Sequence, residues 1–263
     1  MATPILTHNL PVTAPNLPTP ERPVRLVARN LKISQDLAPH SHPCGQITYT
    51  PQGMLQVIAD GTAWFVPPMR AIWIPPDMVH EVRLLTESSL RAIHIHADYS
   101  PLNNEHCLVL EVSNLLRELI FSLEFIEPGT PREQHLTQVI LDELIAAKPL
   151  PIHLPMPKDK RLKNLCEILL AHPASNDTLE MLASKAGASA RTLTRLFEQE
   201  LHMSFGDWRQ QMRLARAYPL IANGTPLSQV ASELGYSSQS AFSAMFKKTF
   251  GVSPTTFFRQ VGE

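Results

Sequence analysis

The stretch VASELGYSSQSAF, residues 230–242, contains the end of one amphipathic helix, a glycine turn and the start of a second helix. Val230 and Ala231 are apolar positions of the first helix, and Gly235 is the residue type that most often ends a helix in a left-handed conformation. Ser237 follows after one residue and is suited to cap the next helix. The stretch therefore predicts two helices joined by a tight turn, which is the pattern of a helix-turn-helix unit.

The same pattern occurs earlier in the chain, as an internal repeat. Residues 182–183 and Gly187 match residues 230–231 and Gly235, at an offset of 48. One inserted residue after the glycine then shifts the offset to 49, so that Leu193, Phe197, Leu201 and Ser204 match Phe242, Phe246, Phe250 and Ser253. A single helical hairpin is as often a packing unit as a binding unit, and the second matching copy favours a functional pair.

The second helix of such a unit enters the major groove of DNA, and its N-terminal residues reach base edges. We expect these helices over 189–199 and 238–249. Arg191 and Arg195 point outward from the first, and arginine can bond guanine bidentately, as Gln239 of the second can bond adenine. The DNA-contact candidates are Ser189, Arg191, Thr194, Arg195, Ser238, Gln239, Ser240, Ser243 and Lys247.

The segment 205–223, between the two units, is expected to be a helix that sets their spacing, so that both recognition helices lie on one face of the duplex. Pro219 lies late in this segment and is expected to kink or shorten the helix. Charge gives little support for DNA binding, because residues 161–263 hold 11 Lys and Arg against 8 Asp and Glu. An ordinary solvated surface explains that mild excess equally well.

Residues 161–263 resemble the DNA-binding domain of the AraC/XylS family of bacterial regulators. The motifs that carry the resemblance are SxRxLxRxF at 189–197, RxxxA at 213–217, GYxSQSxF at 235–242 and FKxxFGxSP at 246–254. It implies sequence-specific binding to double-stranded DNA, and an activator would also contact RNA polymerase. Ala244 departs from the family pattern, because many members carry Arg there, so the second unit is expected to act mainly as a backbone clamp.

The N-terminal half is expected to be β-rich. Short apolar and β-branched runs alternate with Pro and Gly turns at 46–50, 54–59, 62–66, 70–74, 81–85 and 90–96, a spacing typical of a small barrel or sandwich. Helices are expected over 104–126 and 132–147, and four prolines between 149 and 157 indicate a stiff linker. The predicted organisation is an α+β multidomain chain with a disordered segment 1–21, a cupin-like barrel 22–100, a helical dimerisation or packing segment 101–148, a linker 149–160 and an all-α DNA-binding domain 161–263.

His40, His42 and Gln46 resemble the first motif of cupin barrels, with Gln where Glu is usual, and residues 75–80, ending in His80, resemble the second, with Asp77 in place of Gly. In cupins these positions bind one divalent metal, and imidazole ligands suit Zn, Ni or Fe. A relic site without metal stays open. Cys44 would favour Zn if it shared the face of the histidines. His94 and His96 are expected to be structural or edge-strand histidines.

The barrel joined to this DNA-binding domain resembles the effector-sensing architecture of the family. A small-molecule effector would occupy a pocket near Tyr49, Trp64 and Trp73, although core packing explains any one of these aromatics as well. Two other hypotheses stay open: a metal-dependent cupin enzyme with a helical appendage, and a pure metal sensor. The missing Glu and the paired helix-turn-helix units favour a regulator that is not an enzyme. The segment 104–126 is apolar enough to form a homodimer and could equally pack on its own barrel.

Composition is consistent with these expectations. The chain has 263 residues, 44% of them hydrophobic and 18% charged. No apolar run reaches the roughly 18 residues that a membrane helix needs, and the N-terminus has no signal-peptide pattern. Three cysteines lie far apart, which does not indicate a disulfide framework and favours a cytoplasmic protein with no membrane partner.

Overall fold

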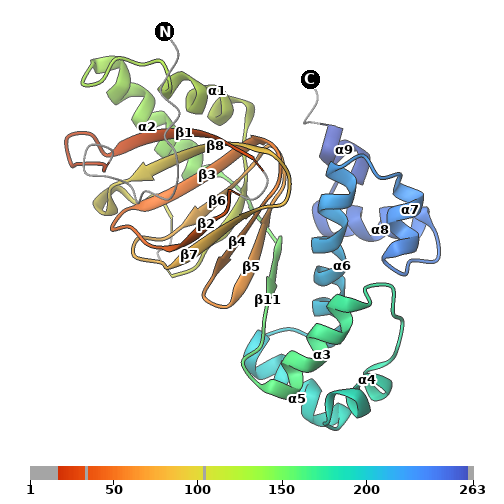
Figure 1. The fold of residues 1–263 in the computed structure, drawn as a ribbon. Coiled ribbons are helices and arrows are strands. Elements are labelled where there is room, and N and C mark those ends of the chain that lie inside the picture. The colour runs from red at the N-terminus through yellow and green to blue at the C-terminus, as the bar shows by residue number, and fades with distance from the viewer. Residues whose placement is uncertain (1–16, 33–34, 103–104, 260–263) are drawn as a thin grey trace. The chain divides into compact units, whose positions relative to one another are not determined.

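The computed structural model describes residues 17–32, 35–102 and 105–259. It confirms the α+β class, with a β-rich N-terminal part and an all-helical C-terminal part (Figure 1). Two compact units divide the chain, one ending at Pro151 and the other comprising Gly61–Phe65 and everything from Ile152 onward. Residues 1–16 of the segment expected to be disordered lie outside the described residues.

The first unit contains two antiparallel sheets. One has the order β1-β8-β3-β6-β9-β10. In the other, β7 pairs with β4 on one side and β2 on the other. The bounds are β1 Val24–Leu31, β2 Leu37–His40, β3 Gly45–Gln52, β4 Leu55–Ala59, β6 Arg70–Ile74, β7 His80–Leu84, β8 Ser88–Ile95, β9 Leu108–Glu111 and β10 Pro149–Leu150.

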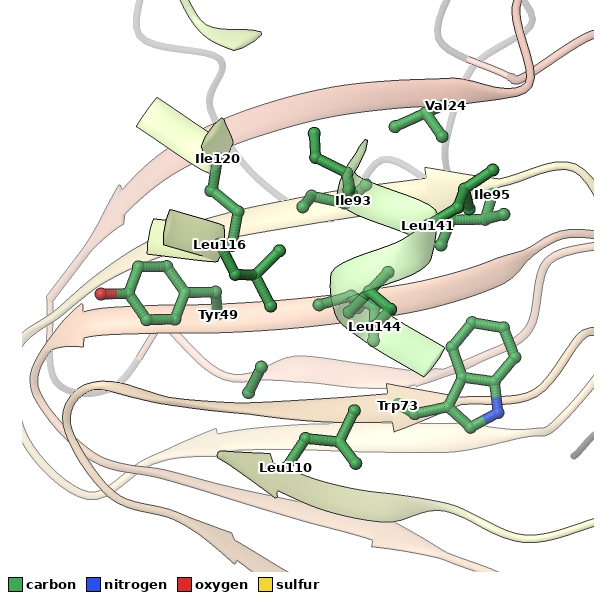
Figure 2. Close-up of a cluster of buried hydrophobic side chains, with 13 residues drawn as sticks. Val24, Tyr49, Trp73, Ile93, Ile95, Leu110, Leu116, Ile120, Leu141 and Leu144 are labelled. Atoms are coloured by element: carbon green, nitrogen blue, oxygen red, sulfur yellow. The ribbon is translucent and has the colours of Figure 1, made fainter. Parts of the chain in front are cut away.

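Side chains alternate across the larger sheet and divide it into two faces. Ile47 and Tyr49 of β3 belong to a buried apolar cluster with α1 (Asn114–Leu123) and α2 (Pro131–Ala146). Figure 2 shows this cluster, in which Leu116 and Ile120 of α1 lie over the sheet. Residues 46, 48 and 50 of β3 point to the opposite face, so the buried polar positions of this strand lie inside the unit.

The segment 104–126 is not one helix, as its periodicity predicted. Residues 108–111 form β9, which pairs with β6 along its whole length, and α1 begins at Asn114 after its cap Ser113. The short apolar run fits a strand as well as a helix. The edge of β6 supplies hydrogen-bond partners for its backbone, so the run forms a strand. Since Leu116 and Ile120 are buried against the sheet, α1 packs on its own unit.

The second unit contains helices α3 to α9 and two short strands that precede them in the sequence. Strand β5 (Thr62–Val66) pairs with β11 (His153–Pro155), so the expected linker segment contains β10 and β11. The helices are α3 Lys160–Ala171, α4 Leu179–Ala186, α5 Ala190–Leu201, α6 Phe205–Ala222, α7 Leu227–Glu233, α8 Gln239–Phe250 and α9 Pro254–Arg259. Helix α6 continues through Pro219 to Ala222, so the proline does not shorten it.

The two repeats form the helix pairs α4–α5 and α7–α8. Gly187 ends α4 with a φ of +72°, and Gly235 follows α7 with a φ of +75°. Ser189 and Ser238 cap the second helices, so the second cap is one residue later than the sequence predicted. Aromatic side chains from α6, α8 and α9, including Tyr218, Phe246 and Phe257, fill the core beneath the second pair.

Candidate functional site

The first candidate site is the outward face of α5. Leu193, Leu196, Phe197 and Leu201 are buried. Arg191, Thr194 and Arg195 are exposed on the opposite side. Because Arg191 and Arg195 are four residues apart, they lie on one helix face. The only recorded contact of the Arg195 guanidinium within the described residues is a 3.4 Å bond to Gln199 Oε1, and this leaves its donors available to a ligand.

The other predicted contacts divide by structural role. The hydroxyl of Ser189 accepts a bond from the Thr192 amide, and the hydroxyl of Ser238 accepts one from the Ala241 amide, so both serine side chains cap helices. Gln239 and Ser240 are exposed at the start of α8, and Ser243 is half-buried. Lys247 is exposed in the last turn of α8, beside Lys248.

Helix α6 holds the two helix pairs together through Arg213. Its guanidinium donates to the carbonyl oxygens of Pro173 (3.1 Å) and Ser175 (2.9 Å) in the loop between α3 and α4. A further bond of 2.9 Å reaches Asn176 Oδ1. The same guanidinium lies 5.4 Å from the ring centre of Tyr236, in the turn of the second pair. Arg213 thus connects the loop that precedes the first repeat to the turn of the second repeat, a role that sequence analysis did not assign to it.

The second candidate site is a cluster of histidines in the first unit. One ligand nitrogen each from His40, His42 and His80 can be chosen so that all lie within 4.8 Å of one another. The pairing of β2 with β7 places His40 directly opposite His80. Their ring centres are 4.3 Å apart, and those of His42 and His80 are 5.1 Å apart. The structure therefore brings together the three histidines that the sequence singled out.

Backbone carbonyls orient these rings. The Nδ1 atoms of His40, His42 and His80 lie 2.8–2.9 Å from the carbonyl oxygens of residues 38, 44 and 78 respectively. A ring that donates Nδ1–H to a carbonyl presents Nε2 as a lone pair, as metal-binding histidines do. Nε2 of His42 and Nε2 of His80 are buried without a protein partner in the described chain. The donor set fits a divalent metal ion.

Burial also favours the neutral imidazoles of His42 and His80. Desolvation lowers the pKa of His80 to about 4, and it lowers the pKa of His42 as well. Neutral imidazole is the metal-binding form. Asp77, which replaces the glycine of the second cupin motif, has a φ of +59°. Asp is among the few residues that tolerate this left-handed conformation, so the turn before His80 is kept despite the substitution.

The remaining predicted residues take other positions. The side-chain amide of Gln46 donates a 2.6 Å bond to Thr48 Oγ1. Cys44 Sγ lies 3.9 Å from Nδ1 of His42, on the side of the ring that faces a carbonyl, and burial raises the pKa of this thiol to about 11. Cys44 is therefore a protonated neighbour of the cluster, outside the group of converging ligands.

The predicted aromatic pocket residues contribute to packing. Tyr49 and Trp73 are fully buried in the apolar cluster between the larger sheet and its helices (Figure 2). Trp64, on β5, lies against His153 with ring centres 4.9 Å apart. His94 was expected to be structural or on an edge strand, but β8 lies between β1 and β3, and its ring is 5.4 Å from that of His42. His96 instead caps a short helical turn outside the cluster.

Comparisons with known proteins agree with this organisation. Residues 28–145 match the model of the AraC-like ligand binding domain, and residues 182–260 match the model of a helix-turn-helix domain. The chain is 30% identical to the HTH-type transcriptional regulator NimR of Escherichia coli strain K12 over 225 residues, 84% of this chain and 82% of that protein.

Two further relatives match a shorter part of the chain. The HTH-type transcriptional regulator RipA of Corynebacterium glutamicum is 33% identical over 103 residues, 39% of this chain and 31% of RipA. The arabinose operon regulatory protein of Escherichia coli strain K12 is also 33% identical over 103 residues, 38% of this chain and 35% of that protein. In the part of the chain that the structure describes, no helix has the length and apolar character needed to cross a bilayer.

Proposed function

The chain belongs to the AraC family of DNA-binding transcriptional regulators with an N-terminal ligand-binding domain, and from this premise we propose that α5 supplies most of its base recognition. The observation that carries the proposal is the exposed pair Arg191 and Arg195 on one face of a capped helix. Helix α8 presents the shorter donors Gln239 and Ser240, and Ala244 is exposed beside them. Lys247 and Lys248 suit phosphate contacts, which position a protein without reading sequence.

Replacing Arg195 with Ala is expected to weaken binding to the cognate site by about 1–3 kcal/mol, the usual contribution of a base-reading arginine. Binding to random DNA should change little. The cognate site is first isolated by mixing the protein with fragmented genomic DNA and sequencing what it retains. Fluorescence anisotropy on that site and on a scrambled duplex then measures both affinities.

Lys247→Ala is the matched control, because it removes an exposed cation from α8 and should weaken binding to the cognate and the scrambled duplex about equally. An equal loss of affinity on both duplexes for Arg195→Ala would show that this arginine only contacts phosphate, and would contradict its role in base recognition.

We further propose that the effector of the N-terminal domain is a divalent metal ion held by His40, His42 and His80. The convergence of three lone pairs supports this, since a buried Nε2 without a partner is costly unless something binds it. Zn²⁺ and Ni²⁺ accept imidazole ligands readily, and Fe²⁺ does so less tightly. A bound cation would join the segment around β2 to β7, and it would alter DNA binding only if it favoured one arrangement of the protein over another.

Substituting His80 with Ala tests the metal proposal. Loss of one of three ligands is expected to lower the affinity for Zn²⁺ by about 10- to 100-fold or more, since even the loss of a residue that only orients a ligand has an effect of that size. Competition with a chromophoric chelator measures the affinity, and His96→Ala is the control histidine outside the cluster. Wild-type protein that binds neither Zn²⁺ nor Ni²⁺ under these conditions would rule the proposal out.

We infer that the barrel senses its ligand and catalyses no reaction on it, so the metal-dependent enzyme is the disfavoured hypothesis. Gln46 is neutral and bonded to Thr48, so the cluster lacks the carboxylate that the cupin motif usually supplies. The proposed setting is the cytoplasm, with double-stranded DNA as the partner and RNA polymerase as a second partner at any activated promoter. Homodimerisation is supported by Leu115 and Phe125, apolar side chains exposed on and just after α1.

A further inference from the structure

His94 is a deeply buried polar side chain whose role the proposed function leaves open. It is 2% exposed, and neither Nδ1 nor Nε2 has a hydrogen-bond partner within the described residues. An imidazole has one donor and one acceptor when neutral, and burying both without partners is unfavourable. Such a group in a native protein calls for a ligand that the protein atoms do not provide.

The sheet places His94 beside the position where cupins carry their carboxylate. In the register of β3 with β8, His94 lies directly opposite Gln46. Side chains of directly paired residues project to the same face of a sheet, so both lie on the polar inner face of the larger sheet. Gln46 directs its amide to Thr48, whereas the His94 ring lies 5.4 Å from the His42 ring, nearly perpendicular to it.

His94 lies next to a group of histidines that already converge. Backbone carbonyls orient the rings of His40, His42 and His80. Within the described residues neither nitrogen of His94 is held by such a bond. His94 lies outside the group of three histidines whose ligand nitrogens converge within 4.8 Å, so its ring would have to move toward His42 to share their ligand.

We propose that His94 is a fourth metal ligand and replaces the carboxylate that Gln46 lacks, which gives an all-imidazole site for a borderline divalent cation. The proposal rests on the metal site of the proposed function. Four imidazole nitrogens are borderline donors and provide no anionic oxygen, so the site should favour Cu²⁺, Ni²⁺ and Zn²⁺ over the oxygen-seeking Mg²⁺ and Mn²⁺.

Electron paramagnetic resonance of the full-length protein loaded with one equivalent of Cu²⁺ tests the number of nitrogen ligands. Wild type is expected to show four coordinated nitrogens and His94→Leu three. The affinity of His94→Leu for Zn²⁺, measured by chelator competition, should fall more than about tenfold. His96→Leu, which removes a histidine outside the cluster, is the control and should keep four nitrogens and wild-type affinity.

The metal-free proteins give a second, independent readout. Leucine removes an unpartnered polar ring without emptying its space, so metal-free His94→Leu should melt at a temperature equal to or higher than that of wild type. His94→Gln, which keeps a polar group, serves if the leucine variant does not fold. Wild type that binds metal through three nitrogens, with unchanged affinity in both variants, would overturn the role of His94 and leave the three-histidine site intact. Absence of any metal binding in wild type would instead refute the metal site itself.

Discussion

Replacing Gly235 with Ala is expected to destabilise the DNA-binding unit by roughly 2–5 kcal/mol. Gly235 has a φ of +75°, a left-handed conformation in which a side chain carries a steric penalty. A Cβ at this position would also lie 2.4 Å from the carbonyl oxygen of Ala174 and 2.9 Å from its Cα. Both atoms belong to backbone, so the loop between α3 and α4 would have to move.

The chain offers a matched control for this prediction. Gly187 occupies the equivalent turn of the first repeat, with a φ of +72°, and a Cβ there would meet nothing within 4 Å. Gly187→Ala should therefore cost only the left-handed strain, about 1–2 kcal/mol. Urea unfolding, with hydrogen exchange of peptides from α3 to α9 to assign the transition, measures both. Equal losses in the two variants would show that the contact with Ala174 has no energetic weight.

These two glycines show which features the sequence predicts and which depend on tertiary packing. Both glycines were identified as helix-ending turns, because a left-handed turn depends only on local chemistry. The approach of Ala174 to Gly235 depends on how the loop after α3 packs on the second repeat, 61 residues further along the chain. No local pattern contains that information.

The histidine cluster shows the same limit. The resemblance of the segments around His40, His42 and His80 to the two cupin motifs was sufficient to predict that these side chains converge. His94 was not predicted to belong to the cluster, since an isolated histidine on a strand is most often structural. Its position opposite Gln46 follows from the pairing of β3 with β8, and the sequence does not specify which strands are neighbours. Residues 108–111 were predicted to be helical for the same reason, because their pairing with β6 cannot be inferred from the local sequence pattern.

Arg213 is a second residue whose role depends on tertiary contacts. The sequence placed it in a family motif on the connecting helix, without a function. In the structure the side chain is 8% exposed and bonds three acceptors in the loop after α3, at Pro173, Ser175 and Asn176. That same loop is the one that contacts Gly235, through Ala174 and through a 3.2 Å bond from Asn176 Nδ2 to the Gly235 carbonyl. Arg213 and Gly235 therefore stabilise one junction between the repeats.

Replacing Arg213 with Ala is accordingly expected to destabilise the DNA-binding unit by roughly 2–5 kcal/mol, because each partly buried acceptor left without a partner costs about 1–3 kcal/mol. Arg213→Lys should recover little of this, since an ammonium cannot reproduce the planar fork of bonds. Arg216→Ala is the control: it lies on the same helix, is exposed, and makes one bond, of 2.8 Å, to the Leu170 carbonyl. Its expected loss is about 1 kcal/mol or less.

The junction also predicts a coupling that separates it from simple loss of packing. If Arg213 and Gly235 act on the same loop, the double variant Arg213→Ala/Gly235→Ala should lose less stability than the sum of the single variants, by about 0.5–3 kcal/mol. Paired with Gly187→Ala, which lies in the other turn, Arg213→Ala should instead be additive within about 0.5 kcal/mol. Additive losses in both double variants would mean that Arg213 and Gly235 are not coupled energetically through the loop after α3. Helix α6 would then hold the two helix pairs through its other contacts.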